Sequence, residues 1–211
     1  MGFKDIFKSK ELVNLTQPII ELGIDSISKD GFVRDIPVID IIAKGYDVVI
    51  KIRRGMYVRK VGEFFTELKD IPLEDREKFI KKIDKSYKRF FEALQVQIDR
   101  IVDEEKAKLI GRLFKAAILE EITIEDFKRY SYMIESVFLY DFTILETTHF
   151  ALIGRAKKEY LYKQGFADQK IKDSDVQMFA HGSKSKAQRP EYVLNDTGKK
   201  IIDICYPDKE R

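Results

Sequence analysis

The chain of 211 residues contains no tryptophan, one cysteine and two histidines. Because Cys205 is the only cysteine, the chain cannot form an internal disulfide or a zinc site with several cysteines. The presence of only His149 and His181 argues against a metal cluster built from histidines. Eleven glycines and five prolines are few for a turn-rich sandwich or barrel. We therefore expect a chain without disulfides, metal ions or other cofactors.

No charge of one sign dominates, and no long apolar run is present. Lys and Arg total 39 against 36 Asp and Glu, and this net charge of +3 does not by itself predict binding to nucleic acid. The hydrophobic fraction of 44% is sufficient for a folded core. No stretch of about 18 uncharged apolar residues occurs, and Met1–Ile6 lacks the apolar core of a signal peptide. These absences predict a cytoplasmic protein.

The motifs of several enzyme classes are also missing. The sequence has no glycine-rich phosphate loop, no Gly-x-Ser-x-Gly elbow and no His-Glu-x-x-His. Cys205 follows an apolar run, which is typical of a packed thiol rather than of a nucleophile. Adjacent acidic pairs such as Glu104-Glu105 point apart on a helix, so they indicate caps and solvated faces. We therefore expect a protein that is not an enzyme.

Three sections follow one another along the chain, at residues 1–70, 71–154 and 155–211. The first contains a long helical pattern from Pro37 to about Leu68. The second repeats apolar residues every three or four positions, and the third changes to shorter elements. The prediction is a mainly α fold. It consists of a helical bundle with a long amphipathic N-terminal helix and a small C-terminal α+β element of winged-helix character.

Several start signals divide the second section into helices. Acidic residues follow Pro72, which favours a helix N-terminus there. Another helix begins after Asp103, and Thr123–Asp126 is a candidate capping box for a helix that continues to Leu145. The connectors between these helices are short, so the pattern predicts an antiparallel bundle.

The segment Ile36–Ile52 carries charge at only four positions, spaced by four, three and four residues. On a helix these positions form one narrow stripe in which each acid lies one turn from a base. The apolar arc is then much wider than on a surface helix, and the helix is about 25 Å long, slightly short of a bilayer core. Four cations follow directly and could reach anionic headgroups. The stripe is Asp40, Lys44, Asp47 and Lys51, and the cations at the expected membrane interface are Arg53, Arg54, Arg59 and Lys60.

Several interpretations of this helix stay open. In one, the bundle buries the helix on most sides and the charged stripe faces solvent. In another, helices from several chains associate in a membrane, and the stripe faces a water-filled lumen in which its charges are paired and hydrated. A helix lying flat on the inner face of the cell membrane is a further alternative, although such helices normally have a broad basic face.

The third section reads as a helix, two short strands and a final helix. The helix through Tyr160 ends near Gly165, and strands are expected at 176–180 and 191–194. A polar loop from His181 to Pro190 joins the strands. The last helix covers residues 199–205.

The residues Leu161–Phe166 and Tyr192–Gly198 resemble the end of a winged-helix module. In such modules the recognition helix often ends in a leucine-to-glycine-apolar pattern, and the second hairpin strand leads into a turn with tyrosine, leucine, a small polar residue and glycine. The same ending is similar to the C-terminus of abortive-infection alpha-type proteins, a bacterial family associated with phage defence. The resemblance implies a helical protein associated with defence and assigns no catalytic residue.

If the hairpin is a wing, six cations and two tyrosines become candidates for contact with nucleic acid. The cations would neutralise phosphates without reading bases, and the tyrosines could stack on unpaired bases. The alternative is a solvated polar hairpin over a small core. The candidate residues are Lys163, Lys170, Lys172, Lys184, Lys186, Arg189, Tyr160 and Tyr162.

Taken together, these patterns predict a non-enzymatic homo-oligomer that acts on the inner face of the cell membrane as a pore or channel in bacterial antiviral defence. A single-stranded nucleic acid or a regulatory protein bound at the C-terminal element would control it. The alternative is a soluble winged-helix regulator that binds nucleic acid, in which residues 36–52 belong to the core. A further alternative is a scaffold protein with neither activity.

Overall fold

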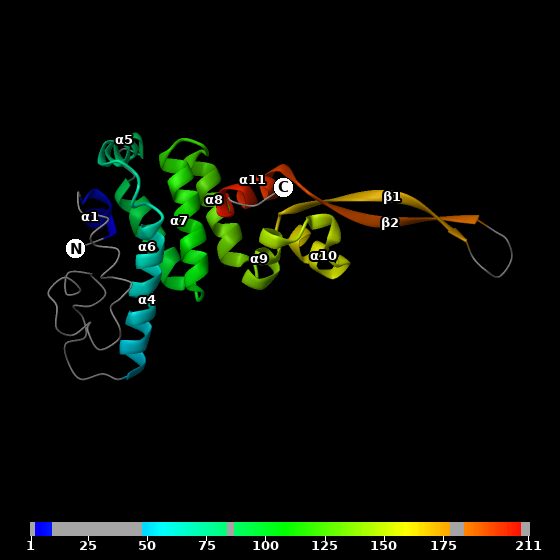
Figure 1. The fold of residues 1–211 in the computed structure, drawn as a ribbon, viewed down its shortest axis with the longest axis horizontal. Coiled ribbons are helices and arrows are strands. Elements are labelled where there is room, and N and C mark those ends of the chain that lie inside the picture. The colour runs from blue at the N-terminus through cyan, green and yellow to red at the C-terminus, as the bar shows by residue number, and fades with distance from the viewer. Residues whose placement is uncertain (1–2, 10–47, 84–86, 178–183, 208–211) are drawn as a thin grey trace. The chain divides into compact units, whose positions relative to one another are not determined.

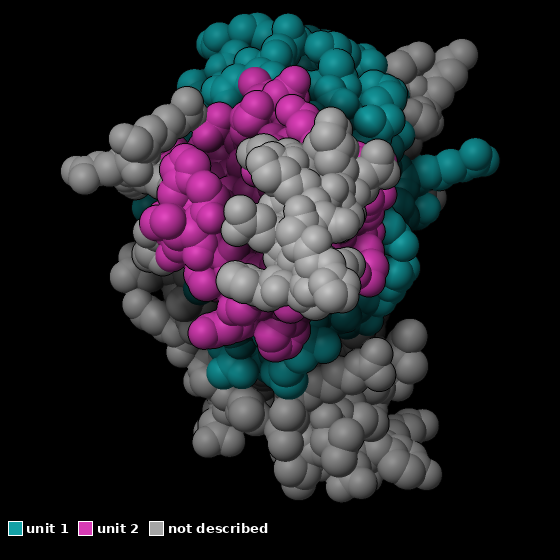
Figure 2. Space-filling model, turned by 90° about the vertical axis from the view of Figure 1, so that its right-hand side faces the viewer, with its two compact units in different colours: residues 1–135 teal, residues 136–211 magenta. Residues whose placement is uncertain are grey.

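The structure is a computed structural model that describes residues 3–9, 48–83, 87–177 and 184–207. These residues are mainly helical and include a two-stranded antiparallel sheet near the C-terminus, as the sequence predicts (Figure 1). The chain divides into two compact units, which Figure 2 shows in different colours. Unit 1 is Met1–Glu135 and unit 2 is Ser136–Arg211. The predicted boundaries after residues 70 and 154 each fall inside a unit.

The described helices of unit 1 are α1 (Phe3–Lys8), α4 (Val48–Thr66), α5 (Leu73–Ile83), α6 (Tyr87–Arg100), α7 (Glu104–Ile118) and α8 (Ile124–Ser136). Unit 2 contains α9 (Leu139–Thr147), a short 3-10 turn η4 (Phe150–Leu152), α10 (Arg155–Lys163), β1 (Ala167–Gln177), β2 (Lys184–Leu194) and α11 (Asp196–Cys205). The long N-terminal helix predicted from Pro37 stays a prediction, because residues 37–47 lie outside the described residues.

The core of unit 1 is built around the ring of Phe114 on α7. This side chain is fully buried, and its ring lies 5.2 to 6.2 Å, centroid to centroid, from rings on each of the other described helices of the unit. Such contacts add to the free energy gained by burying the rings. The partner rings are Phe7, Phe64, Phe79, Phe90, Phe91 and Phe127.

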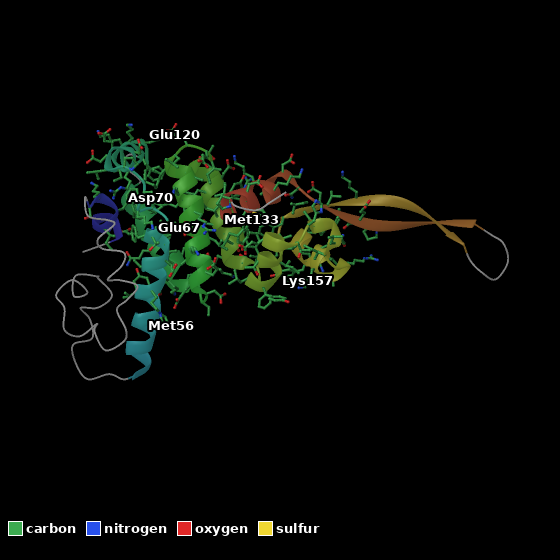
Figure 3. The ribbon with its side chains drawn as sticks, viewed as in Figure 1. Met56, Glu67, Asp70, Glu120, Met133 and Lys157 are labelled. Atoms are coloured by element: carbon green, nitrogen blue, oxygen red, sulfur yellow. The ribbon has the colours of Figure 1, made fainter. Side chains whose placement is uncertain are left out.

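Helices α4 and α7 lie side by side and run in the same direction. A Cβ atom added at Gly111 of α7 would lie 2.6 Å from the carbonyl oxygen of Phe64, so the close approach of the two backbones requires glycine there. Farther along, Arg112 pairs with Glu67, which is labelled in Figure 3, at 3.2 Å. By contrast, α7 and α8 run antiparallel, as the sequence predicts.

Among the described residues of unit 1, three cations are buried, and each donates to one or two main-chain carbonyls where a neighbouring helix ends. Lys60 does so at the end of α6, Arg76 at the end of α1 and Lys106 at the end of α8. The hydrogen bonds run from Lys60 Nζ to Asp99 O and Ile101 O (2.7 Å each), from Arg76 Nη1 to Phe7 O (2.6 Å) and Ser9 O (3.0 Å), and from Lys106 Nζ to Glu135 O (2.8 Å). Terminal carbonyls without helical partners carry partial negative charge, so a buried cation both satisfies and stabilises them.

Helix α8 begins at the predicted cap but ends earlier than predicted. The Thr123 hydroxyl accepts a hydrogen bond from the Asp126 N–H (3.0 Å) and donates to the Asp126 carboxylate (2.9 Å). The single helix expected to reach Leu145 is wrong, because α8 ends at Ser136 and α9 begins at Leu139. The backbone is extended at Phe138, where the N–H donates to the Tyr160 hydroxyl (2.7 Å) instead of continuing the helix.

Unit 2 closes around Phe166, which is fully buried. Gly165 before it has φ of 87°, a conformation that favours glycine at the end of α10, as predicted. The Asn195 side chain accepts from the Gly198 N–H (2.7 Å) and starts α11, while the Asn195 backbone N–H donates to Phe166 O (3.1 Å). A Cβ atom at Gly198 would also collide with the carbonyl oxygen of Phe166. The start of α11 therefore packs directly against the backbone at the base of the sheet, and this close approach requires glycine.

The two strands are longer than the sequence predicts. The strand expected at 176–180 begins at Ala167, and the loop expected from His181 to Pro190 is wrong for Lys184–Pro190, which belongs to β2. Polar residues fill most positions of both strands, so neither strand shows the alternation of apolar and polar residues that identifies a half-buried strand. The sequence pattern of this hairpin therefore gives little sign of where its strands begin and end.

We expect Phe114→Ala to lower the free energy of unfolding of unit 1 by about 3–5 kcal/mol, because it leaves a cavity that all the surrounding rings line. Urea denaturation followed by circular dichroism measures this change. Val102→Ala is the matched control, since Val102 is 74% exposed and should change stability by less than about 0.5 kcal/mol. Equal midpoints for the two variants would contradict the assignment of Phe114 as the centre of the core.

Candidate nucleic-acid interface

Most of the charged stripe predicted for Ile36–Ile52 lies outside the described residues. Asp40, Lys44 and Asp47 lie outside the described residues, and only the backbone of Lys51 is described, within α4. Among the helices that the structure does describe, none combines the length and the apolar composition that crossing a bilayer requires. The stripe and its proposed lumen therefore stay predictions.

The four cations expected at a membrane interface lie on α4, and the two whose side chains are described have different environments. For Arg53 and Arg54 only the helical backbone is described. Arg59 forms an ion pair with Glu104 of α7 at 2.8 Å. Lys60 is 4% exposed and is bonded to the carbonyls at the end of α6, so its ammonium group cannot reach a lipid headgroup in this fold. For Lys60 the predicted role is replaced by a structural one.

The hairpin of β1 and β2, called the ribbon below, is the element that carries most of the predicted contacts with nucleic acid (Figure 1). Each strand has 11 residues, which is about 36 Å at 3.3 Å per residue. Ala167 and Tyr192 at its base are buried, whereas Ile171 is already 66% exposed. Among the described residues, β1 and β2 pair only with each other.

The register places the ribbon cations on both of its faces. Lys172 and Arg189 are direct partners across the ribbon, and Lys170 shares their face. Lys184 and Lys186 occupy the other face, opposite Gln177 and Asp175. Lys170 is the ribbon cation whose side chain is described, and it is exposed.

Helix α10 contributes less than the sequence predicts. The Tyr160 hydroxyl is occupied by the Phe138 N–H, so Tyr160 serves the fold rather than stacking on bases. Tyr162 is 38% exposed and its ring packs on Tyr192 at 5.3 Å. Lys163 pairs with Glu159 at 2.9 Å, and this hydrogen bond raises the pKa of the lysine. Tyr162 and Lys163 are the candidates on α10 that remain accessible.

Three cations at the start of α10 were not among the predicted contacts. Lys157, labelled in Figure 3, pairs with Asp141 at 3.2 Å and lies over the Tyr140 ring at 4.4 Å. Lys158 donates to Ala151 O at 2.8 Å. Arg155 is exposed and makes no ion pair among the described residues of unit 2. The run Arg-Ala-Lys-Lys directly after Gly154 was the available sequence signal, and the structure shows that two of its three cations stabilise the unit itself.

Two of the residues considered for catalysis or metal binding, Cys205 and His149, take structural positions. Cys205 is buried, and the His149 Nδ1 accepts a hydrogen bond from the Ala151 N–H (3.2 Å) at the start of η4. His181 lies outside the described residues. In the part of the chain that the structure describes, the His, Cys, Asp and Glu side chains form no group that could hold a metal ion.

Comparisons with known proteins assign no family to the chain. No protein-family model, no curated protein and no solved structure matches it. The likeness of Leu161–Phe166 and Tyr192–Gly198 to winged-helix modules and to abortive-infection alpha-type proteins therefore rests on those two segments alone.

Proposed function

We propose that the chain is a nucleic-acid-binding regulator that uses the ribbon of unit 2 to contact phosphates. The observation that carries the proposal is a long two-stranded ribbon with five cations on its two faces, in which Ala167 and Tyr192 at the base are buried and Ile171 farther along is exposed. A two-stranded ribbon fits the major groove of B-DNA, and Lys and Arg contacts with phosphates need no base sequence. The strands also contain four acidic residues, so modest affinity without strong sequence preference is expected.

The order of elements around the ribbon supports a winged-helix-like reading of unit 2. Helix α10 ends at Gly165, the two strands follow, and Asn195 starts the apolar helix α11. In that reading α10 would be the recognition helix. Its cations Lys157 and Lys158 are bonded within the unit, so the ribbon rather than the helix carries the proposed contact.

Replacing Lys184, Lys186 and Arg189 together by Gln should weaken binding and reduce its salt dependence. On duplex DNA, each lost phosphate contact reduces the magnitude of the slope of log K against log salt by about 0.9. The magnitude of the slope should therefore be smaller for the variant than for the parent by roughly 2 to 3. Fluorescence anisotropy with a short labelled oligonucleotide, as a single strand and as a duplex, measures the slope. Gln is chosen because it removes charge without adding repulsion.

The matched control replaces three exposed lysines of α5, namely Lys78, Lys81 and Lys82, by Gln. This variant loses the same charge from unit 1 and should keep the affinity and slope of the parent. If both triple variants bind alike, the ribbon is not the binding surface and overall charge explains the binding. If the parent does not bind either form of the oligonucleotide, the proposed function is wrong.

A second candidate function is a homo-oligomeric membrane effector in bacterial defence, and the spacing of the stripe residues favours it. Asp40 and Asp47 alternate with Lys44 and Lys51 at intervals of four, three and four, as expected for a charged lumen on an otherwise apolar helix. The defence role comes from the resemblance of the C-terminal residues alone.

For this candidate, we expect the purified parent to release dye from anionic liposomes. Replacing Asp40 and Asp47 by Leu should abolish that release, because the two remaining lysines would be unpaired in the lumen. The urea midpoint of the variant should match that of the parent. Unchanged leakage from the variant would contradict the lumen, and absence of leakage from the parent would remove this candidate.

A further inference from the structure

A groove of about 430 Å³ runs between α6 and α8 of unit 1. Its floor is formed by Phe90, Leu94 and Phe127, whose side chains are at most 9% exposed. The rings of Phe90 and Phe127 both rest on Phe114 of α7, at 5.8 and 5.2 Å. The groove is therefore a trough between two helices that flank α7, and the central ring of the core supports its floor.

The two walls run in the same direction. At one end the rings of Phe90 and Phe127 lie 5.9 Å apart, and at the other end Gln97 donates to Glu135 at 3.0 Å. Small side chains, Ala93 and Ser131, line the groove between these ends and leave room there. The wall on α6 from residue 89 to residue 100 is about 16 Å long at a rise of 1.5 Å per residue.

The two ends of the groove differ in charge. Arg89 and Lys128 line the end near the phenylalanine rings, and both are exposed. Neither forms an ion pair with any described residue of unit 1, so both cationic groups are available to an anionic ligand as far as the described residues show. At the opposite end the Glu135 carboxylate accepts from Gln97 and pairs with Arg100 at 2.8 Å, so its charge is already neutralised.

We propose that this groove binds an anionic amphiphile, with a carboxylate or phosphate head between Arg89 and Lys128 and an acyl tail along the floor. Two cations on neighbouring helices suit a single anionic head, because hydrogen bonds between charged groups are stronger than those between neutral groups. The apolar floor suits a tail, and the volume lies in the range of small-molecule sites. The proposal is independent of the ribbon, since all of its residues belong to unit 1.

A helix from a partner protein is the other occupant that such a groove suggests. The pairing of Gln97 and Arg100 with Glu135 closes one end, which suits a tail that stops there better than a helix that runs through. A wall of about 16 Å also gives a helix only three turns of contact. The charge asymmetry favours a molecule with one charged end.

Isothermal titration calorimetry of the full chain with sodium dodecanoate, below its micellar concentration, tests the proposal. We expect one binding site per chain. Dodecyltrimethylammonium has the same tail and the opposite head charge, so it should bind at least about tenfold more weakly. Octanoate should also bind more weakly than dodecanoate, because it buries fewer methylenes.

Two variants test the two ends of the ligand. Arg89→Gln combined with Lys128→Gln should weaken dodecanoate binding by about tenfold or more, and Ala93→Trp should block the tail. The matched control combines Lys81→Gln with Arg129→Gln, two exposed cations that do not line the groove, and should bind as the parent does. Urea midpoints equal to that of the parent establish that each variant is folded.

Equal binding of dodecanoate and dodecyltrimethylammonium would overturn the proposal, as would parent-like binding by both groove variants. An acidic amphipathic peptide provides the last arm of the experiment. If that peptide binds and Ala93→Trp blocks it, while dodecanoate does not bind, the groove docks a protein helix and the proposed ligand is wrong.

Discussion

The packing of α7 against its neighbours through Phe114 is the interaction on which unit 1 depends. Each of the other described helices of that unit places a phenylalanine ring against this side chain. One ring therefore sets the separation of α6 and α8, and that separation leaves the groove above Phe90 and Phe127. Gly111 lets α4 approach α7 at backbone distance, and Phe64 of α4 also packs on Phe114.

The buried cations complete this arrangement at the helix ends. Lys60, Arg76 and Lys106 each donate to main-chain carbonyls at the end of a neighbouring helix. Burial lowers the pKa of Lys106 from its usual value, which is the electrostatic cost of placing an ammonium there. Hydrogen bonds to carbonyls at the negative end of a helix offset that cost. Lys60 on α4, predicted to lie at a membrane interface, is consequently part of the core of unit 1.

Much of the fold could be predicted from local sequence signals. The length of the ribbon and the role of Lys60 could not. The apolar repeats predicted helical structure from Pro72 onward but not the break between α8 and α9, whereas the Thr123 cap of α8 and the end of α10 at Gly165 are as expected. The length of the ribbon was not predictable from alternation, because backbone pairing holds strands that are polar on both faces. The role of Lys60 was hidden because its partners, some forty residues away, are main-chain carbonyls that leave no mark on the sequence.

The measurement that tests the central claim most directly is amide chemical-shift mapping of the full ¹⁵N-labelled chain with a short oligonucleotide at two salt concentrations. The account predicts the largest shifts at residues 167–177 and 184–194, with smaller ones at Tyr162 and Lys163. These shifts should shrink at the higher salt concentration, because the proposed contact is with phosphates. Shifts centred on the helices of unit 1, or shifts of equal size at both salt concentrations, would contradict it.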